Sequence, residues 1–101
     1  MEDHIGRFPM SFLEGATGAL RAVAHPIRLA IIDLLGKSPS LNVTEIHESL
    51  GIEQAVASHH LRIMKDKGLL SSQREGKNTF YSLKSPEVAT FISLMEQLQK
   101  A

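Results

Sequence analysis

The sequence predicts a mainly α (α+β) fold, in which about five helices accompany a two-stranded β-hairpin. The stretch from Asn42 to Leu83 reads as a short helix, a tight turn, a longer helix and two strands joined by a charged turn. Apolar residues recur at helical spacing on both sides of this stretch. With 101 residues, the chain has room for one domain with a modest core.

The first ten residues show no apolar periodicity and include Gly6 and Pro9. Glycine and proline interrupt regular structure, so we expect residues 1–10 to form a flexible N-terminal arm. Residues 11–101 then form a single domain.

The first helix is expected over residues 11–24. Ser11 can cap it, and Glu14 lies three residues later, the spacing of a capping box. Gly15 and Gly18 each cost about 1 kcal/mol relative to alanine, and are either tolerated or allow close approach of a second helix. The apolar positions that recur at helical intervals are Phe12 or Leu13, Ala16, Leu20 and Val23.

His25 and Pro26 open the next helix, because proline suits the first helical turn. Its buried stripe is expected to consist of Ile27, Ala30, Ile31, Leu34 and Leu35. Gly36 is expected to end it, and Arg28 to be an exposed or ion-paired structural residue without a DNA contact. Leu41 and Val43 follow as a short first strand.

The next two helices have the spacing of a helix-turn-helix. Asn42 or Thr44 can cap the first of them through a side-chain oxygen. Ile46 and Leu50, four residues apart, mark its buried face. Gly51 follows, where a helix often ends in a left-handed conformation that glycine adopts easily.

The helix over residues 54–67 carries the candidate binding chemistry. At 100° per residue, Ala57, Leu61 and Met64 share one face. The opposite face and its flank are mostly small, polar or basic: Gln54, Ala55, Ser58, His59, Arg62, Lys65 and Asp66. Glutamine can pair with adenine, serine serves several bases and alanine can meet a thymine methyl group. We therefore predict base contacts from Gln54, Ala55, Ser58 and His59, and phosphate contacts from Arg62 and Lys65.

Two strands follow, at 69–74 and 79–83, where β-branched and aromatic residues favour an extended chain. The connection Glu75-Gly76-Lys77-Asn78 is a charged hairpin turn. Arg74, Lys77 and Asn78 lie at its tip, where they can contact phosphates or a minor groove.

Ser85 and Pro86 start a final helix with an apolar stripe. The helix-turn-helix already has its own core, so stripes on the first and last helices suggest a partner surface. We expect a two-fold homodimer built on residues 11–24 and 86–98, the alternative being a monomer that buries both stripes. The predicted interface residues are Leu13, Ala16, Leu20, Val88, Phe91, Ile92, Met95 and Leu98.

The net charge is zero, but the charges are unevenly distributed. Residues 1–57 carry a balance of −3, residues 58–84 carry +4, and residues 85–101 carry −1. The positive charge therefore coincides with the second helix of the motif and the hairpin, as a nucleic-acid binder needs. The low total predicts moderate, strongly salt-dependent affinity.

Several motifs together carry a resemblance to a known family. They are Ala24-His25-Pro26-Ile27-Arg28-Leu29, Gly51-Ile52-Glu53-Gln54, Ser58-His59-His60-Leu61, Lys67-Gly68-Leu69, Arg74-Glu75-Gly76-Lys77 and Tyr81-Ser82-Leu83. Over residues 20–83 the chain resembles the ArsR-type winged-helix repressors. The resemblance implies a homodimer that represses promoters and often releases them when a metal or another signal binds.

Two metal sites of the ArsR-type family are missing from this sequence. Thiolate sensors of this family carry Cys-x-Cys where this chain has Asn42 and Thr44. Other sensors of this family carry an Asp-x-His pair and a later histidine pair in the last helix. This region here reads Ser85-Pro86-Glu87 and then Glu96-Gln97-Leu98-Gln99-Lys100, without histidine. Glu53 also departs from the small polar residue that the family usually has there.

The five histidines have different expected roles. We expect His25 to cap a helix, His60 to hydrogen-bond within the fold and His59 to contact DNA. A zinc or nickel site formed by His4 and His47 with Glu45 or Glu48 across a dimer is a minor alternative. We predict no metal site and no other cofactor.

The absence of cysteine excludes disulfides and thiolate sites. The chain has no apolar run of about 18 residues and no basic leader, which predicts a cytoplasmic protein. Motifs of phosphate loops and nucleophile elbows are absent, which argues against an enzyme. We predict a sequence-specific DNA-binding transcription regulator, a homodimeric repressor on an inverted-repeat operator. The alternatives are a protein-interaction dimer without DNA selectivity and a histidine-based metal-sensing repressor.

Overall fold

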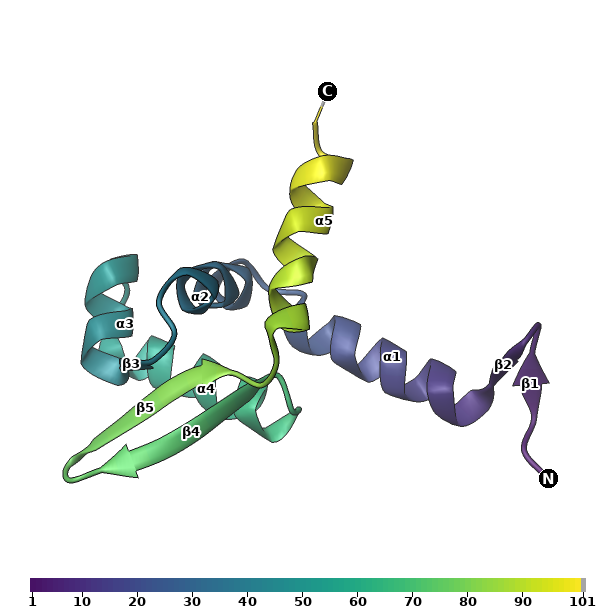
Figure 1. Cartoon of the computed structure of the whole chain (residues 1–101), viewed down its shortest axis with the longest axis horizontal. Helices are drawn as coiled ribbons and strands as arrows, with labels where there is room; N and C mark the ends of the chain where they lie inside the picture. The colour runs from purple at the N-terminus through teal and green to yellow at the C-terminus, as the bar shows by residue number, and fades with distance from the viewer. Residues whose placement is uncertain (101) are drawn as a thin grey trace.

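The computed structural model describes residues 1–100, which form a small helical body with two projecting helices (Figure 1). The helices are α1 (Met10–Val23), α2 (Pro26–Lys37), α3 (Val43–Leu50), α4 (Gln54–Asp66), the 3₁₀ helix η1 (Pro86–Ala89) and α5 (Thr90–Leu98). The strands are β1 (His4–Ile5), β2 (Phe8–Pro9), β3 (Leu41–Asn42), β4 (Leu70–Glu75) and β5 (Asn78–Leu83). This is the predicted winged helix-turn-helix.

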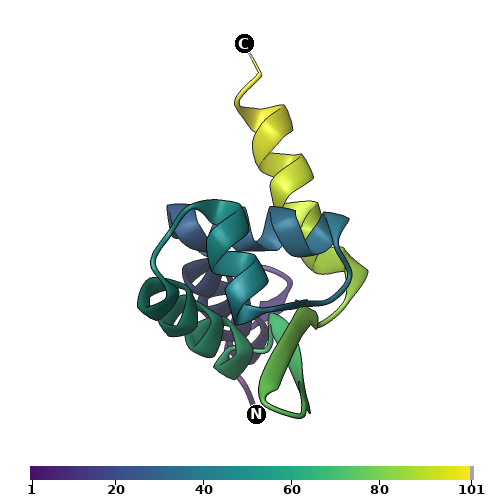
Figure 2. The ribbon, with the colours of Figure 1, turned by 90° about the vertical axis from the view of Figure 1, so that its left-hand side faces the viewer.

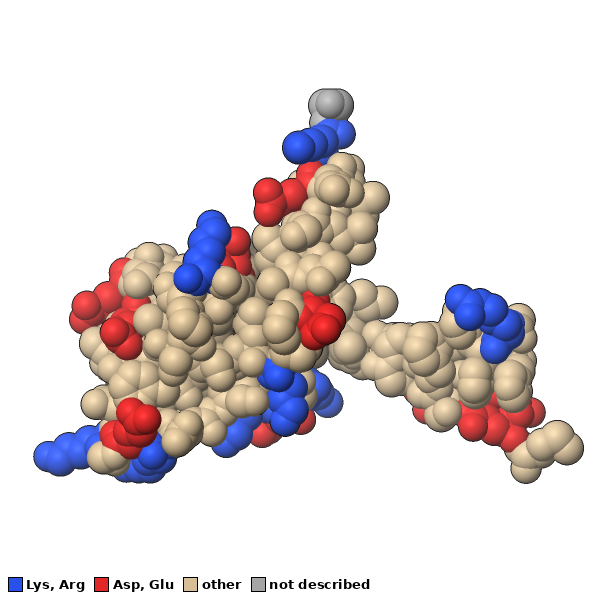
Figure 3. All heavy atoms as spheres, in the orientation of Figure 1, with Lys and Arg blue, Asp and Glu red and all other residues tan. Residues whose placement is uncertain are grey.

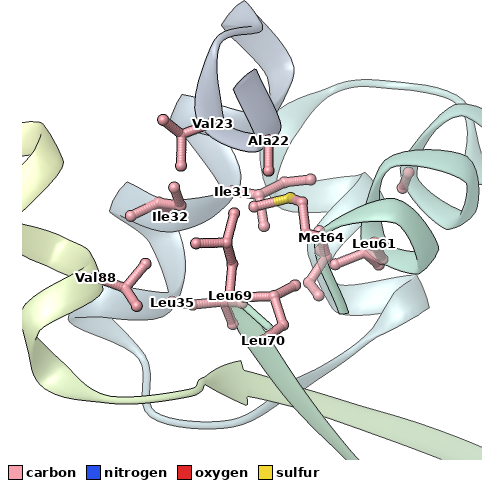
Figure 4. Packing of buried hydrophobic residues seen from close by; sticks show 12 residues of the cluster. Ala22, Val23, Ile31, Ile32, Leu35, Leu61, Met64, Leu69, Leu70 and Val88 are labelled. Carbon is pink, nitrogen blue, oxygen red and sulfur yellow. The ribbon is translucent and has the colours of Figure 1, made fainter. Parts of the chain in front are cut away.

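The core lies where α2, α3 and α4 meet the base of the β4–β5 hairpin (Figures 2 and 4). Its fully buried large side chains are Ile31, Ile32, Ile46, Leu61 and Met64. Ala22 and Val23 enter it from the end of α1, and Val88 enters it from η1 (Figure 4). Only the last turn of α1 therefore belongs to the core.

Local sequence signals account for the helix-turn-helix. The Asn42 side chain accepts a hydrogen bond from the Glu45 N–H at 2.8 Å, and the Glu45 carboxylate accepts one from the Asn42 N–H at 2.9 Å. This reciprocal pair is a capping box, and it selects Asn42 over Thr44 as the cap. Gly51 ends α3 at φ 66°, the left-handed conformation expected for it.

The helix α2 starts as predicted, but its end and one of its buried residues differ from the prediction. The His25 Nδ1 accepts a hydrogen bond from the Ile27 N–H at 3.1 Å, which caps the helix. The prediction that Gly36 ends α2 is wrong, because the helix continues to Lys37. A Cβ at Gly36 would lie 3.5 Å from that of Ala89, so this glycine marks the close approach of η1. Ala30 is exposed rather than buried, and Ile32 takes its place in the core.

The first residues contain regular structure. Residues 1–10, expected to form a flexible arm, contain the antiparallel pair β1–β2, with His4 opposite Pro9. The helix α1 begins at Met10, so the capping box predicted for Ser11 and Glu14 is wrong. The N–H of Ser11 instead donates to the Glu2 carboxylate at 2.6 Å.

The three-stranded sheet has the order β3-β5-β4 and is antiparallel throughout. The short strand β3 covers Leu41 and Asn42, whereas Val43, predicted to be extended, already belongs to α3. The hairpin pairs Glu75 with Asn78 across a two-residue turn. Gly76 opens this turn at φ 62°, which glycine adopts at little cost.

Two helices extend away from the body: α1 sideways and α5 upwards (Figure 1). The radius of gyration is 15.3 Å, compared with about 13 Å for a compact domain of this length. Large apolar side chains remain exposed on both helices, including Leu20 at 56% and Leu98 at 68%. The fold therefore leaves the two predicted interface helices uncovered. Within residues 1–100, every helix is too short or too polar to cross a membrane.

Candidate nucleic-acid interface

The two faces of α4 separate as the helical period predicts. Ala57, Leu61 and Met64 are fully buried. The predicted contact residues Gln54, Ala55, His59, Arg62 and Lys65 are exposed, Ser58 is half-buried, and Asp66 is exposed at the far end of the helix. The structure thus presents a mostly polar face of α4 to the outside and packs the apolar face into the core.

The hairpin β4–β5 lies beside α4, and both elements occupy the lower side of the molecule (Figures 1 and 2). Arg74, Lys77 and Asn78 are exposed near its tip. The Nε atom of Arg74 donates to the Gly76 carbonyl oxygen at 3.2 Å. Arg74 therefore curls over the turn and shapes the tip, while its remaining N–H groups stay available.

Charge is segregated over the surface. Lys and Arg atoms gather along the lower edge, over the hairpin tip and near the end of α4, with fewer acidic atoms among them (Figure 3). Acidic atoms gather over α3, where Glu45 and Glu48 are exposed. A surface of this kind attracts a polyanion to the face of α4 and the hairpin and repels it from α3.

Arg28 has a role that the sequence pattern did not reveal. It is half-buried, and its Nε donates to the Nδ1 of His60 at 3.1 Å. The prediction that Arg28 is exposed or ion-paired is therefore wrong, because it is half-buried and donates to the His60 imidazole and the Ala22 carbonyl oxygen. The prediction that His60 bonds within the fold is confirmed. The two residues are 32 positions apart, so no local spacing connects them.

The predicted interface residues differ in how they are placed. Leu20 and Leu98 are largely exposed, and most of the others are half-buried. Val88 is different: it is only 9% exposed and packs in the core of its own protomer, which leaves little surface for a partner. Leu94, 48% exposed, was absent from the predicted set, although its helical spacing from Phe91 and Leu98 was a signal. The half-buried residues are Leu13, Ala16, Phe91, Ile92 and Met95.

The remaining histidines, His4 and His47, lie on β1 and α3. The Nδ1 of His4 is 3.0 Å from the Glu2 carbonyl oxygen, and that of His47 is 3.1 Å from the Ile52 carbonyl oxygen. Within residues 1–100, no three His, Cys, Asp or Glu side chains are grouped as metal ligands. Both histidines are thus arranged around backbone carbonyls of their own chain.

A helix-turn-helix followed by a β-hairpin, with a polar helix face beside a cationic hairpin, defines a winged helix-turn-helix protein. Residues 25–72 match the model of the family described as bacterial regulatory protein, arsR family. The transcriptional repressor PagR of Bacillus anthracis is 38% identical over 87 residues, which cover 86% of this chain and 87% of PagR. The regulator YgaV of Escherichia coli K12 is 34% identical over 85 residues, 84% of this chain and 86% of YgaV.

Solved structures agree with these relationships. The crystal structure of PagR has a TM-score of 0.76 at 37% identity and covers 85% of this chain and 98% of that one. A homodimeric winged helix-turn-helix DNA-binding domain from Mycobacterium bovis has a TM-score of 0.78 at 28% identity, covering 97% and 89%. The chain belongs to the arsR family of bacterial regulatory proteins, a family of transcriptional regulators and not of enzymes.

Proposed function

We propose that this protein is a homodimeric transcriptional repressor that binds an inverted-repeat operator. The observation that carries the proposal is the exposed polar face of α4 beside the cationic β4–β5 hairpin. The relative PagR is named as a transcriptional repressor, which supports repression as the outcome. Bacterial promoters are in the cytoplasm, so the protein would act there.

The exposed residues divide into two groups by chemistry. Gln54, Ala55, Ser58 and His59 lie in the first half of α4, the part of a recognition helix that meets base edges. Arg62, Lys65, Arg74, Lys77 and Asn78 would hold the sugar-phosphate backbone. Glu53 precedes the helix and carries a negative charge; it either accepts from a cytosine amino group or favours the helix N-terminus.

Dimerisation would occur through the uncovered faces of α1 and α5. These helices expose large apolar side chains, and exposed clusters of that kind mark interaction surfaces. The similar domain from Mycobacterium bovis is homodimeric, which supports a second copy as the partner. A two-fold dimer would place the two α4 helices in successive major grooves, about 34 Å apart.

Selection of bound duplexes from a random pool tests the proposal directly. We expect enrichment of an inverted repeat whose half-sites are about one helical turn apart. Affinity for the enriched duplex should fall steeply as salt rises, since each phosphate contact releases counterions. A control protein with Arg62, Lys65 and Lys77 all replaced by alanine should enrich nothing. Failure of the unmodified protein to enrich any sequence would favour a protein-interaction dimer instead.

A further inference from the structure

Arg28 joins the projecting helix α1 to the candidate recognition helix α4. Its Nη1 donates to the Ala22 carbonyl oxygen at 3.2 Å, and its Nε donates to the Nδ1 of His60 at 3.1 Å. Ala22 lies in the last turn of α1, where carbonyls have no partner within the helix. His60 lies in the middle of α4 and directly follows His59 of the predicted base-reading face. One side chain therefore spans the helix that would form the dimer and the helix that would read DNA.

The hydrogen bond to His60 requires a neutral imidazole. A guanidinium can only donate, so the Nδ1 of His60 must accept and its proton must lie on Nε2. His60 is 7% exposed, and its ring packs 4.3 Å from that of His25 and 5.2 Å from that of His59, between centroids. A proton on Nδ1 would point at Arg28 and break the bond.

The surroundings of His60 oppose its protonation. Burial lowers the pKa of His60 below its usual value, and His25, Arg28 and His59 lower it further by repulsion. These three groups come from the start of α2, from α2 and from α4 itself. Among residues 1–100, α1, α3 and β4 also pack against α4, and none of their charged side chains contributes to this shift. Protonation would thus bury a positive charge beside the Arg28 guanidinium and two further imidazole rings.

We propose that Arg28 and His60 are positioning residues for DNA binding, and that protonation of His60 releases α4 from α1 so that the protein leaves its operator as pH falls. The proposal rests on the proposed function as a DNA-binding dimer. The distance between the two α4 helices of a dimer depends on how each is fixed to α1. Loss of the Arg28 link would therefore loosen both the orientation of α4 and the half-site spacing.

The predicted change in DNA affinity with falling pH is opposite to the change that protonation of exposed histidines would cause. Protonation of exposed histidines adds positive charge, which strengthens binding to DNA at low pH. Release of the link weakens binding at low pH. The sign of the change in DNA affinity with pH therefore distinguishes release of the Arg28–His60 link from simple protonation of exposed histidines.

The test measures the affinity of the full chain for its selected duplex at fixed salt, from about pH 7.5 to about pH 4.5, because the lowered pKa of His60 places its protonation below the usual histidine range. Circular dichroism at each pH confirms that the protein remains folded. We expect affinity to fall by roughly tenfold, the ratio that loss of one buried hydrogen bond can produce. In His60→Asn, the amide oxygen can accept the hydrogen bond in place of Nδ1 and does not titrate. Whatever its affinity at the higher pH, this variant should therefore bind about equally well at both ends of the pH range. The matched control His4→Asn, in the distant N-terminal hairpin, should still lose affinity as pH falls.

A second variant and a measurement without DNA complete the test. Arg28→Lys keeps the positive charge but loses the two guanidinium donors that reach His60 and Ala22. This variant should therefore bind DNA more weakly at the higher pH, and its affinity should not fall further at low pH. In NMR spectra, the Arg28 Nε–H signal should lose its protection from exchange as the His60 ring titrates. If no duplex is selected, the proposed function has failed, and the NMR titration still decides whether the link opens. Unchanged or stronger binding at low pH, a decrease that persists in His60→Asn, or an Nε–H signal that survives the titration would overturn the proposal.

Discussion

The Glu2 carboxylate accepts a hydrogen bond from the backbone N–H of Ser11 at 2.6 Å. The N–H of Met10 likewise donates to the Asp3 carbonyl oxygen at 2.8 Å. Two residues that precede the β1–β2 hairpin therefore satisfy donors at the start of α1 and replace the local cap that the sequence pattern indicated. The β1–β2 hairpin folds the chain back, so that Glu2 and Asp3 lie at the start of α1 and cap it.

This contact predicts a pH-dependent change at the start of α1. The Ser11 side chain and then the Ser11 backbone N–H lower the pKa of Glu2 by hydrogen bonding to its carboxylate. The stabilising contribution of Glu2 is therefore complete above the ordinary carboxyl pKa of 4.5 and is lost as pH falls through the lowered value. An NMR titration should show the Ser11 amide signal moving together with the Glu2 carboxyl signal. In Glu2→Ala the amides of the first turn should exchange faster with solvent. Independent titration of the two signals would contradict the contact.

Removal of the capping box should destabilise the protein. Asn42→Ala eliminates the side-chain acceptor at the start of α3 and should lower the free energy of unfolding by about 1 kcal/mol. That change corresponds to a melting temperature lower by about 4–8 °C for a domain of this size. Thr44→Ala, in the exposed first turn of the same helix, is the matched control and should change stability by less than about 0.5 kcal/mol. Equal losses in the two variants would show that Asn42 is not the cap.

The apolar stripes predict which substitutions separate two subunits. A charge at Leu20 or Leu98 cannot be buried cheaply, so Leu20→Lys or Leu98→Lys should weaken the dimer at least about tenfold. Sedimentation should show a monomer at concentrations where the unmodified protein is a dimer. Ser93→Lys adds the same charge to α5 outside the stripe and should leave the assembly intact. A Leu98→Lys protein that remains a dimer would place the interface elsewhere.

Replacement of Gln54 should reduce sequence preference, whereas replacement of Arg62 should reduce affinity for every duplex. Gln54→Ala should reduce the preference for the selected duplex by about 1–3 kcal/mol, because a base contact is lost. Arg62→Ala should weaken binding to all duplexes similarly and lower the slope of log affinity against log salt by about one unit. Competition titrations at several salt concentrations measure both quantities. The same behaviour of both variants would refute the division between base and backbone contacts.

Most of the recognition unit was predictable because its signals are local. Asn42 and Glu45 cap a helix three residues apart, and Ala57, Leu61 and Met64 share a face through the helical period. The resemblance to ArsR-type repressors was confirmed as family membership. The predictions that failed concern longer-range arrangements, such as the cap of α1 and the partners of Arg28.

The sequence by itself determined the order of the helices, the hairpin and the polar face of α4, since each follows from residues within about one turn or one strand pair of each other. The tertiary structure decided that Arg28 meets His60, that Glu2 caps α1 and that Val88 belongs to the core of its own protomer. These outcomes depend on which faces of separate elements come together. That choice is made by packing of the whole chain, and a local pattern does not contain it.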